Sequence, residues 1–333
     1  MISKKVKRFV LGVCLLSMAP LAYSIDGAPR HMIFASDTQY PWTDKLDRRE
    51  PESEADFDKR SKWLVETQFA SIVDFRKNHA QSHVPLMING DITAFGHGWQ
   101  RSYMSSMLKK YFNGDFLYGL GNHDYENNVD DCFSNNCAAG SIVEFKEHHE
   151  NKVDNFDLKV AGNFLSRLYS GSLAYSKNMG DVHMVQLNNE PTYATRISHA
   201  LNPTTFDITS TLDWLENDLR VARTQGYAII INMHKPMEMM GDSEQVWRFY
   251  QMIRKYEVTA IFAGHLHDQG GDAYDVNGVP MYLSGATSQQ TYLVASFSED
   301  RKQLHINLVK DNQWQTRKLL DTVPVKSIWA SRP

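Results

Sequence analysis

The chain has 333 residues, of which 42% are hydrophobic and 22% are charged, and its 35 Lys plus Arg against 39 Asp plus Glu give a net charge of −4 at pH 7. This composition excludes a fibrous or broadly disordered protein, and the length is sufficient for a substantial core in one large domain or two. Beyond the N-terminus the sequence has no cluster of Lys and Arg, so a nucleic acid polymer is a poor partner.

The N-terminus has the layout of a secretory signal peptide. Basic residues at Lys4–Arg8 precede an apolar run at Phe9–Leu16, and small residues occur within Ala22–Ser24. We therefore expect residues 1–24 to be a signal peptide that is cleaved after Ser24, and the mature protein to be periplasmic or secreted. Cleavage would remove four Lys or Arg and no Asp or Glu. The mature protein would then have 31 Lys plus Arg against 39 Asp plus Glu, a net charge of −8.

Two alternatives for the N-terminus involve the membrane. An uncleaved anchor is disfavoured because the apolar run is shorter than the roughly 20 residues that a spanning helix needs. A lipid anchor at Cys14 is disfavoured by Val13, since lipoprotein signal sequences resemble one another in carrying a small residue there. We expect no stable membrane anchor after cleavage, and a monomer is the default because no heptad pattern or long apolar stripe is present.

Cys132 and Cys137 are the cysteines that remain after cleavage, and they lie in the polar segment 127–137. In an oxidising compartment they are expected to form a disulfide that stiffens this loop. The alternative is a metal-binding pair, but two thiolates without neighbouring Cys or His in the sequence would be an incomplete site.

Strand-like and helix-like stretches alternate from residue 32 to about residue 264, which indicates layered α/β architecture. Apolar runs predict buried strands at 32–35, 86–89, 229–232 and 259–263, and helical spacing predicts helices around 65–73, 212–219 and 246–253. The absence of a long Pro/Gly/Ser linker favours a single domain over residues 25–333.

Short strands follow residue 271, beginning with a hairpin turn at Asn277-Gly278. We predict further strands at 291–297, 302–309 and 313–319, and expect these strands to complete a second sheet. The polar, Asn-rich start of the segment 125–172 predicts an insertion over the site, where substrate selection would reside.

Five polar motifs follow apolar runs of this kind. Their order is Asp37-Thr38-Gln39, Gly90-Asp91, Gly121-Asn122-His123-Asp124, His234 and Gly264-His265-Leu266-His267. Each is expected where a buried strand ends, which is where α/β folds place chemistry. The alternative of ordinary buried polar groups does not account for glycines beside the polar residues, where the chain would turn sharply next to a metal cluster.

These motifs resemble those of the calcineurin-like metallophosphoesterase superfamily, whose pattern is Asp-x-His, Gly-Asp, Gly-Asn-His-Asp/Glu, a lone His and Gly-His-x-His. Four of the five blocks match, and the resemblance covers roughly residues 31–290. It implies an α/β fold of the metallo-dependent phosphatase type, a four-layer α/β/β/α sandwich in which two mixed sheets are flanked by helices.

The resemblance also implies two divalent metal ions. The first would be bound by Asp37, Gln39, Asp91 and His267, and the second by Asp91, Asn122, His234 and His265, so that Asp91 bridges them. Carboxylate, amide and imidazole ligands suit Mn, Fe or Zn better than a calcium cage or an all-thiolate zinc site.

Such a centre clamps phosphoryl oxygens and activates a water as hydroxide for in-line attack, so no protein nucleophile is required. The leaving oxygen still needs a proton. His123, next to a ligand but not itself a ligand, is the predicted general acid, and Asp124 is predicted to orient its ring.

Gln39 departs from the family pattern, in which most members carry His. A neutral amide oxygen is a weaker donor than an imidazole nitrogen, so metal at the first position is expected to bind less tightly. Enzymes similar to the manganese-dependent ADP-ribose/CDP-alcohol diphosphatases also carry Asp-x-Gln, which shifts the expected metal toward manganese or iron.

The substrate is expected to be small and phosphorylated. The chain lacks the Gly-Asp-x-x-Asp-Arg-Gly motif of the protein serine/threonine phosphatases, which disfavours a phosphoprotein. Aromatic residues near the motifs could stack on a nucleobase, although core packing is their commoner role: Tyr40, Trp42, Phe95, Trp99 and Tyr125.

We therefore predict a periplasmic or secreted dinuclear-metal phosphoesterase that favours phosphodiester or nucleotide-like diphosphate substrates. A phosphomonoesterase of the same fold is the alternative. A non-catalytic secreted binding protein is a further one, but such a protein would be free to lose His123.

Overall fold

The structure, a computed structural model, describes residues 27–163, 165–236 and 243–327. The expected signal peptide, residues 1–24, lies outside the described residues. Within the described ranges, none of the helices combines the length and the apolar character that a membrane span requires.

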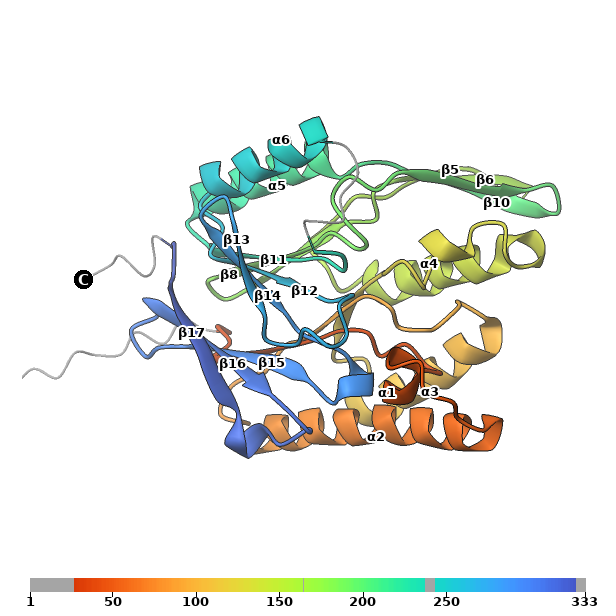
Figure 1. Cartoon of the computed structure of the whole chain (residues 1–333). Helices are drawn as coiled ribbons and strands as arrows, with labels where there is room; N and C mark the ends of the chain where they lie inside the picture. The colour runs from red at the N-terminus through yellow and green to blue at the C-terminus, as the bar shows by residue number, and fades with distance from the viewer. Residues whose placement is uncertain (1–26, 164, 237–242, 328–333) are drawn as a thin grey trace, which may run out of the picture.

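Two mixed sheets form the centre of the molecule (Figure 1). The six-stranded sheet has the order β17-β16-β15-β1-β2-β3, with β1 (His31–Ala35), β2 (Leu86–Asn89), β3 (Leu117–Gly119), β15 (Tyr292–Phe297), β16 (Gln303–Val309) and β17 (Lys318–Pro324). The seven-stranded sheet has the order β13-β14-β12-β11-β8-β7-β4, with β4 (Asn155–Phe156), β7 (Tyr175–Met179), β8 (Val182–Gln186), β11 (Ala228–Asn232), β12 (Ala260–Ala263), β13 (Ala273–Val276) and β14 (Val279–Leu283).

Helices cover the outer faces of both sheets. The helices are α1 (Asp44–Asp47), α2 (Glu54–Asn78), α3 (Gly98–Phe112), α4 (Asn136–His149), α5 (Leu212–Gln225) and α6 (Ser243–Lys255). In Figure 1, α2 lies below the six-stranded sheet, and α5 and α6 lie above the seven-stranded sheet. The predicted four-layer α/β/β/α sandwich is therefore confirmed.

The longest helix illustrates why these layers form. The hydroxyl of Ser53 caps the start of α2 by accepting the Asp56 N–H at 3.2 Å. Phe69, Ile72 and Phe75 recur at helical spacing and are fully buried against the six-stranded sheet. Each buried side chain of this size contributes about 1.5–3 kcal/mol relative to exposure.

Apolar side chains also join the two sheets face to face. Phe34 of β1 stacks on Phe262 of β12 with ring centroids 3.6 Å apart. Both residues lie on strands that are buried almost along their whole length. Strands that are covered on both faces have continuous apolar sequences, as these two do. This packing brings the ends of β1 and β12 to the same side of the molecule.

We had expected the strands after residue 271 to complete one sheet together, but they are divided between two sheets. The hairpin β13–β14, with positive φ at Asn277 and Gly278, joins the seven-stranded sheet, whereas β15 pairs antiparallel with β1 in the six-stranded sheet. Local patterns predict strands but not their partners. The strand predicted at 313–319 also begins later, because Trp314–Thr316 forms a 3-10 turn before β17.

A third sheet projects from the sandwich, at the right of Figure 1, and was not predicted. Its order is β5-β6-β10-β9, with β5 (Lys159–Asn163), β6 (Ser166–Gly171), β9 (Thr195–His199) and β10 (Asn202–Ile208). The segment 125–172 contributes β5 and β6 to this third sheet. The same segment also contains α4, which contacts α3 and β3 of the main body.

Candidate metal centre

The predicted site residues follow parallel strands of both sheets. Asp37 follows β1, Asp91 follows β2 and Asn122 follows β3, and these three strands are parallel neighbours. His234 follows β11 and His265 follows β12, which are also parallel neighbours. The carboxyl ends of both parallel sets converge, so that side chains far apart in the sequence come into contact.

The first half of the centre contains Asp37, Gln39, Asp91 and His267. Oδ1 of Asp37 lies 3.3 Å from Nε2 of His267, and Nε2 of Gln39 donates to Oδ2 of Asp91 at 3.5 Å. Oδ1 of Asp37 and Oε1 of Gln39 are buried without a hydrogen-bond partner. Buried oxygens left in this way are costly unless another group satisfies them, and a cation would do so.

The second half is arranged around His234. Its Nδ1 donates to the Asn89 carbonyl at 2.8 Å, so Nε2 is the nitrogen that binds either a proton or a metal ion. That nitrogen lies 2.9 Å from Oδ1 of Asn122, 3.2 Å from Oδ2 of Asp91 and 3.2 Å from Nδ1 of His265. Electron-pair donors that crowd together repel one another unless a cation or proton lies between them.

The charges of the centre reflect this crowding. Burial lowers the pKa of His234, but the carboxylates of Asp91 and Asp37 outweigh burial and raise it to about 9. Burial and the neighbouring His234 lower the pKa of His265 to about 4. A proton on His234 thus relieves the repulsion that a metal ion would otherwise relieve.

The backbone is strained at the same positions. Asp37, Gln39, Asp91 and His265 have φ values of 51°, 39°, 51° and 70°, in the left-handed region that non-glycine residues seldom adopt. Such outliers cluster at functional sites because the surrounding fold enforces them.

Two motif glycines allow the chain segments to approach. A Cβ atom on Gly121 would lie 2.6 Å from the Asp91 nitrogen, and one on Gly264 would lie 2.6 Å from Oδ2 of Asp37. Neither position leaves space for a side chain. These contacts give the physical reason for glycine beside the site residues.

Asp47, which the sequence motifs did not indicate, fixes the ring of His267. Its Oδ1 accepts hydrogen bonds from Nδ1 of His267 and Nε1 of Trp42, each at 2.7 Å, and its Oδ2 accepts from Ser288 and Gln289, each at 2.6 Å. Nε2 of His267 is thereby directed at Asp37. Burial lowers the pKa of His267, but the nearby carboxylates of Asp37 and Asp47 raise it to about 10.

His123 lies at the edge of the centre, but Asp124 does not hold its ring as we had expected. Nδ1 of His123 donates instead to the Ala94 carbonyl at 2.6 Å, and the His123 N–H donates to Oδ1 of Asp91 at 2.8 Å. The ring lies between Trp42 and Phe95, at centroid distances of 5.5 Å and 6.2 Å.

The Asp124 carboxylate instead binds the backbone of neighbouring loops. It accepts N–H groups of Ile92, Thr93 and Gly121 at 3.0–3.1 Å. Burial and the Asp91 charge raise the pKa of Asp124 to about 7, although these hydrogen bonds oppose the shift. The expected contact with His123 fails because the carboxylate is turned toward these donors.

The aromatic residues near the motifs divide into two groups. Tyr40 and Tyr125 are buried in the core, so the packing interpretation holds for them. Phe95 and Trp99 are 46% and 56% exposed, and Trp42 contacts both His123 and His267. The rings that could meet a substrate are therefore Trp42, Phe95 and Trp99.

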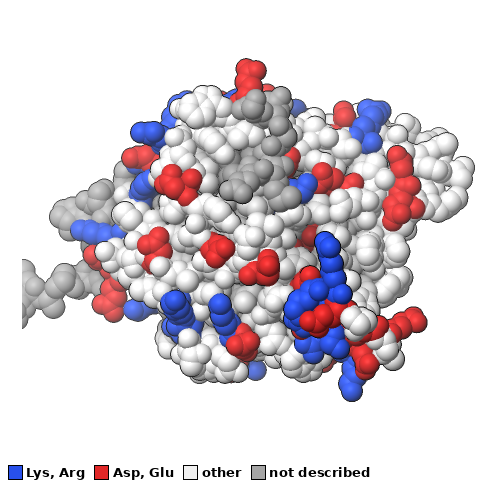
Figure 2. All heavy atoms as spheres, viewed as in Figure 1, with Lys and Arg blue, Asp and Glu red and all other residues white. Residues whose placement is uncertain are grey.

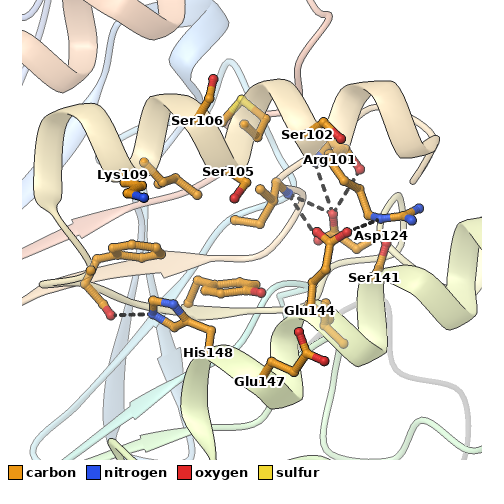
Figure 3. A pocket seen from close by; sticks show the side chains of 18 of the residues that line it. Arg101, Ser102, Ser105, Ser106, Lys109, Asp124, Ser141, Glu144, Glu147 and His148 are labelled. Atoms are coloured by element: carbon orange, nitrogen blue, oxygen red, sulfur yellow. Dashed lines mark hydrogen bonds and ion pairs between the residues drawn. The ribbon is translucent and has the colours of Figure 1, made fainter.

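A cavity of about 690 Å³ between α3 and α4 is separate from this centre (Figure 3). Ser102, Ser105 and Glu147 line it, and Asp124 forms part of its wall. None of the seven predicted metal ligands borders it. The cavity therefore meets the Asn122–His123 loop only through the neighbouring residues Leu120 and Asp124.

All seven predicted ligands converge in one place, and their chemistry fits two divalent cations. They supply carboxylate, amide and imidazole groups. Two of the oxygen atoms, one on Asp37 and one on Gln39, are buried without a hydrogen-bond partner. Asp91 stands between the halves, since its Oδ2 faces both Gln39 and His234. Borderline metals such as Mn, Fe or Zn accept this donor set.

Comparison with known proteins gives the family. The family model described as calcineurin-like phosphoesterase matches residues 31–269. Because this match covers well over half of the chain, the protein belongs to the calcineurin-like phosphoesterases, which are metal-dependent phosphoester hydrolases. No curated protein matches the chain.

Solved structures are similar in fold. The purple acid phosphatase PPD1 of yellow lupin, Lupinus luteus, is 11% identical with a TM-score of 0.51, and the match covers 91% of this chain and 55% of that chain. The sulfate thiohydrolase SoxB of Thermus thermophilus is 11% identical with a TM-score of 0.46, covering 92% and 58%. The chain thus spans little more than half the length of these neighbours.

Proposed function

We propose that this protein is an exported dinuclear-metal hydrolase of phosphodiester or nucleotide-like diphosphate bonds. The observation that carries the proposal is the convergence of metal-ligating atoms around Nε2 of His234, together with the partnerless oxygens of Asp37 and Gln39. The export signal that the sequence predicts within residues 1–24 supports action outside the cytoplasm on a small substrate.

Two positions for metal follow from the donor atoms. Asp37, Gln39, Asp91 and His267 would hold one ion, and Asp91, Asn122, His234 and His265 the other. When bound, ions at these positions supply Lewis-acid activation of water and of the phosphoryl group.

His123 supplies the proton for the leaving oxygen in this proposal. Its Nδ1 is committed to the Ala94 carbonyl, so Nε2 is the nitrogen that can deliver a proton to substrate. The His123 N–H holds Oδ1 of Asp91, which ties the acid to the bridging ligand. Asp124 contributes by fixing the loops on which Asp91 and His123 stand.

The substrate class is supported by the surroundings of His123. Trp42 and Phe95 flank its ring, and aromatic faces at a leaving-group position favour a planar group such as a nucleobase. The face in Figure 2 shows Lys and Arg interspersed with Asp and Glu rather than gathered in one basic patch. This surface favours a small substrate over a nucleic acid polymer.

Hydrolysis of bis-p-nitrophenyl phosphate and p-nitrophenyl phosphate tests the proposal. The protein is stripped of metal, reloaded with Mn, Fe or Zn, and compared with D91N and H123A. We expect metal-dependent turnover that favours the diester and is lost in D91N. Preference for the monoester would select the phosphomonoesterase alternative, and bound metal without turnover of either ester would select the binding protein.

A further inference from the structure

A second cluster of metal-ligating side chains lies outside the metal centre. Within the described ranges, two groups of three or more His, Cys, Asp or Glu bring ligand atoms within 4.8 Å of one another. One group belongs to the metal centre. The other, here called the Cys-loop cluster, consists of His97, Asp131, Cys132 and Cys137, and the proposed function does not use it.

We infer that the Cys-loop cluster binds one zinc ion when the disulfide between Cys132 and Cys137 is reduced. Two thiolates, one imidazole and one carboxylate supply four donors, the number and the kind that zinc binds in structural sites. Zinc-binding cysteine pairs are commonly separated by about two to four residues. Cys132 and Cys137 are five positions apart, at the upper end of this spacing.

The structure changes how the cysteine pair is interpreted. The sequence alone offered no nearby His, because His97 lies far upstream in the chain. Folding places Nε2 of His97 4.0 Å from Oδ2 of Asp131, beside the disulfide. The objection that the two thiolates would be an incomplete site therefore no longer holds. The inference does not depend on the proposed function.

The loop that carries the cysteines is held by contacts besides the disulfide. Asn135, which is buried, donates to Oδ1 of Asp130 at 3.1 Å and to the Ser198 carbonyl at 2.9 Å, and accepts the Asp130 N–H at 2.5 Å. Cys137 lies in the first turn of α4. These contacts keep the two sulfur atoms close together after reduction.

His97 is also fixed in place. It is the residue before α3, its N–H donates to Oε1 of Gln100 at 3.3 Å, and its carbonyl accepts the Arg101 N–H at 3.0 Å. Arg101 additionally donates to the Asn136 carbonyl at 3.2 Å, which joins α3 to the cysteine loop. The ligands from both segments are thus held together before metal arrives.

The redox step balances with a dithiol reductant. The S–S bond accepts two electrons and two protons to give two thiols, while the dithiol is oxidised to a disulfide. Cys132 is partly exposed and Cys137 is buried, so a thiolate can attack at Cys132. Zinc then displaces the two thiol protons and binds both thiolates.

The Cys-loop cluster is next to the catalytic acid without sharing a ligand with the metal centre. His97 and Ala94 belong to the same short segment, and the Ala94 carbonyl accepts the hydrogen bond from His123. The rings of Phe95 and His97 lie 5.9 Å apart. A zinc ion here would therefore bind at the segment that holds His123.

Cobalt spectroscopy tests the inference, because a thiolate-to-cobalt charge-transfer band cannot come from the metal centre, which has no cysteine. The full chain carries C14S, so that Cys14 cannot bind cobalt. The protein is reduced with a phosphine, the phosphine is removed under anaerobic conditions, and the reduced protein is titrated with Co²⁺. We expect one bound cobalt ion, beyond those that the metal centre takes up, to give the near-ultraviolet band, and Zn²⁺ to abolish the band by displacement. D91N, which alters only the metal centre, is expected to keep the band.

The matched variants are H97Q and D131N. Each is expected to weaken cobalt binding at least tenfold, since even partners of metal ligands contribute about 10–100-fold. Asp131 is exposed, so D131N decides the question even where H97Q does not fold. Absence of the band from reduced protein, or unchanged affinity in folded D131N, would overturn the inference.

Discussion

Two groups of buried or half-buried histidines in this molecule, one in the metal centre and one on α4, experience opposite electrostatic surroundings. In the metal centre, nearby carboxylates outweigh burial and raise the pKa of His234 to about 9 and that of His267 to about 10. On α4, burial lowers the pKa of His148 to about 4 and that of His149 well below its usual value.

The difference separates a cation site from a structural core. His149 accepts the Tyr118 N–H at 3.2 Å and donates to the Phe145 carbonyl at 2.8 Å, so the neutral ring is fully satisfied. In the metal centre, by contrast, carboxylates surround the rings. Nε2 of His234 faces oxygens of Asp91 and Asn122, and Nε2 of His267 faces Asp37. Burial is common to both regions, and only the arrangement of negative charge distinguishes them.

The largest effect is expected from D91N, which removes the carboxylate proposed to bridge the two ions and so makes the electrostatics of the metal centre more like those of α4. Both ions lose a ligand, and turnover should fall by at least about 10³-fold. Metal content by mass spectrometry and diester hydrolysis are measured together. Full activity with two bound ions would show that Asp91 does not bridge them.

H123A is expected to lower turnover by about 10²–10⁴-fold on a dinucleoside phosphate, whose alkoxide leaving group needs a proton. The loss should be smaller on bis-p-nitrophenyl phosphate, because nitrophenolate leaves without protonation. Metal content should not change. Equal losses on both substrates would argue against His123 as the acid.

D47A is expected to weaken metal binding at the first position by about 10–100-fold, because His267 loses the carboxylate that directs its ring. Calorimetric titration with Mn²⁺ should show one weakened and one unchanged site. D44A is the matched control, since Asp44 is also on α1 but pairs with Arg48 and Arg60. Equal weakening in D44A and D47A would point to α1 as a whole.

H148Q tests the second region and has the smallest expected effect. The folded-state pKa of His148 is about 4, below the unfolded value of about 6.5, so its contribution to stability is complete above pH 6.5 and is lost as pH falls toward 4. Urea unfolding of metal-free protein at about pH 7 and pH 5 should show about 1 kcal/mol less pH dependence in H148Q. An unchanged difference would contradict the shift.

Much of the centre could be predicted from the sequence because strand ends and glycines are local features. Asp37, Asp91 and His234 each follow an apolar run, and parallel strands bring such positions together. Asp47 carries no motif and reaches His267 only through the position of α1. The Ala94 carbonyl replaces Asp124 as partner of His123, and any residue provides a backbone carbonyl.

Long-range pairing explains the remaining differences. The sequence predicted β15 and β16 as strands, but nothing local indicates that β15 pairs with β1. The projecting sheet is likewise formed by segments on either side of β7 and β8. Partnership between distant strands depends on which apolar faces meet, and this is decided by the whole fold.

Anomalous diffraction from crystals of manganese-loaded protein will show whether the strand ends hold two cations. We expect two anomalous peaks about 3.5–4 Å apart, with the carboxylate of Asp91 between them. A single peak, or peaks away from the residues around His234 and His267, would show that the strand ends do not form a dinuclear site.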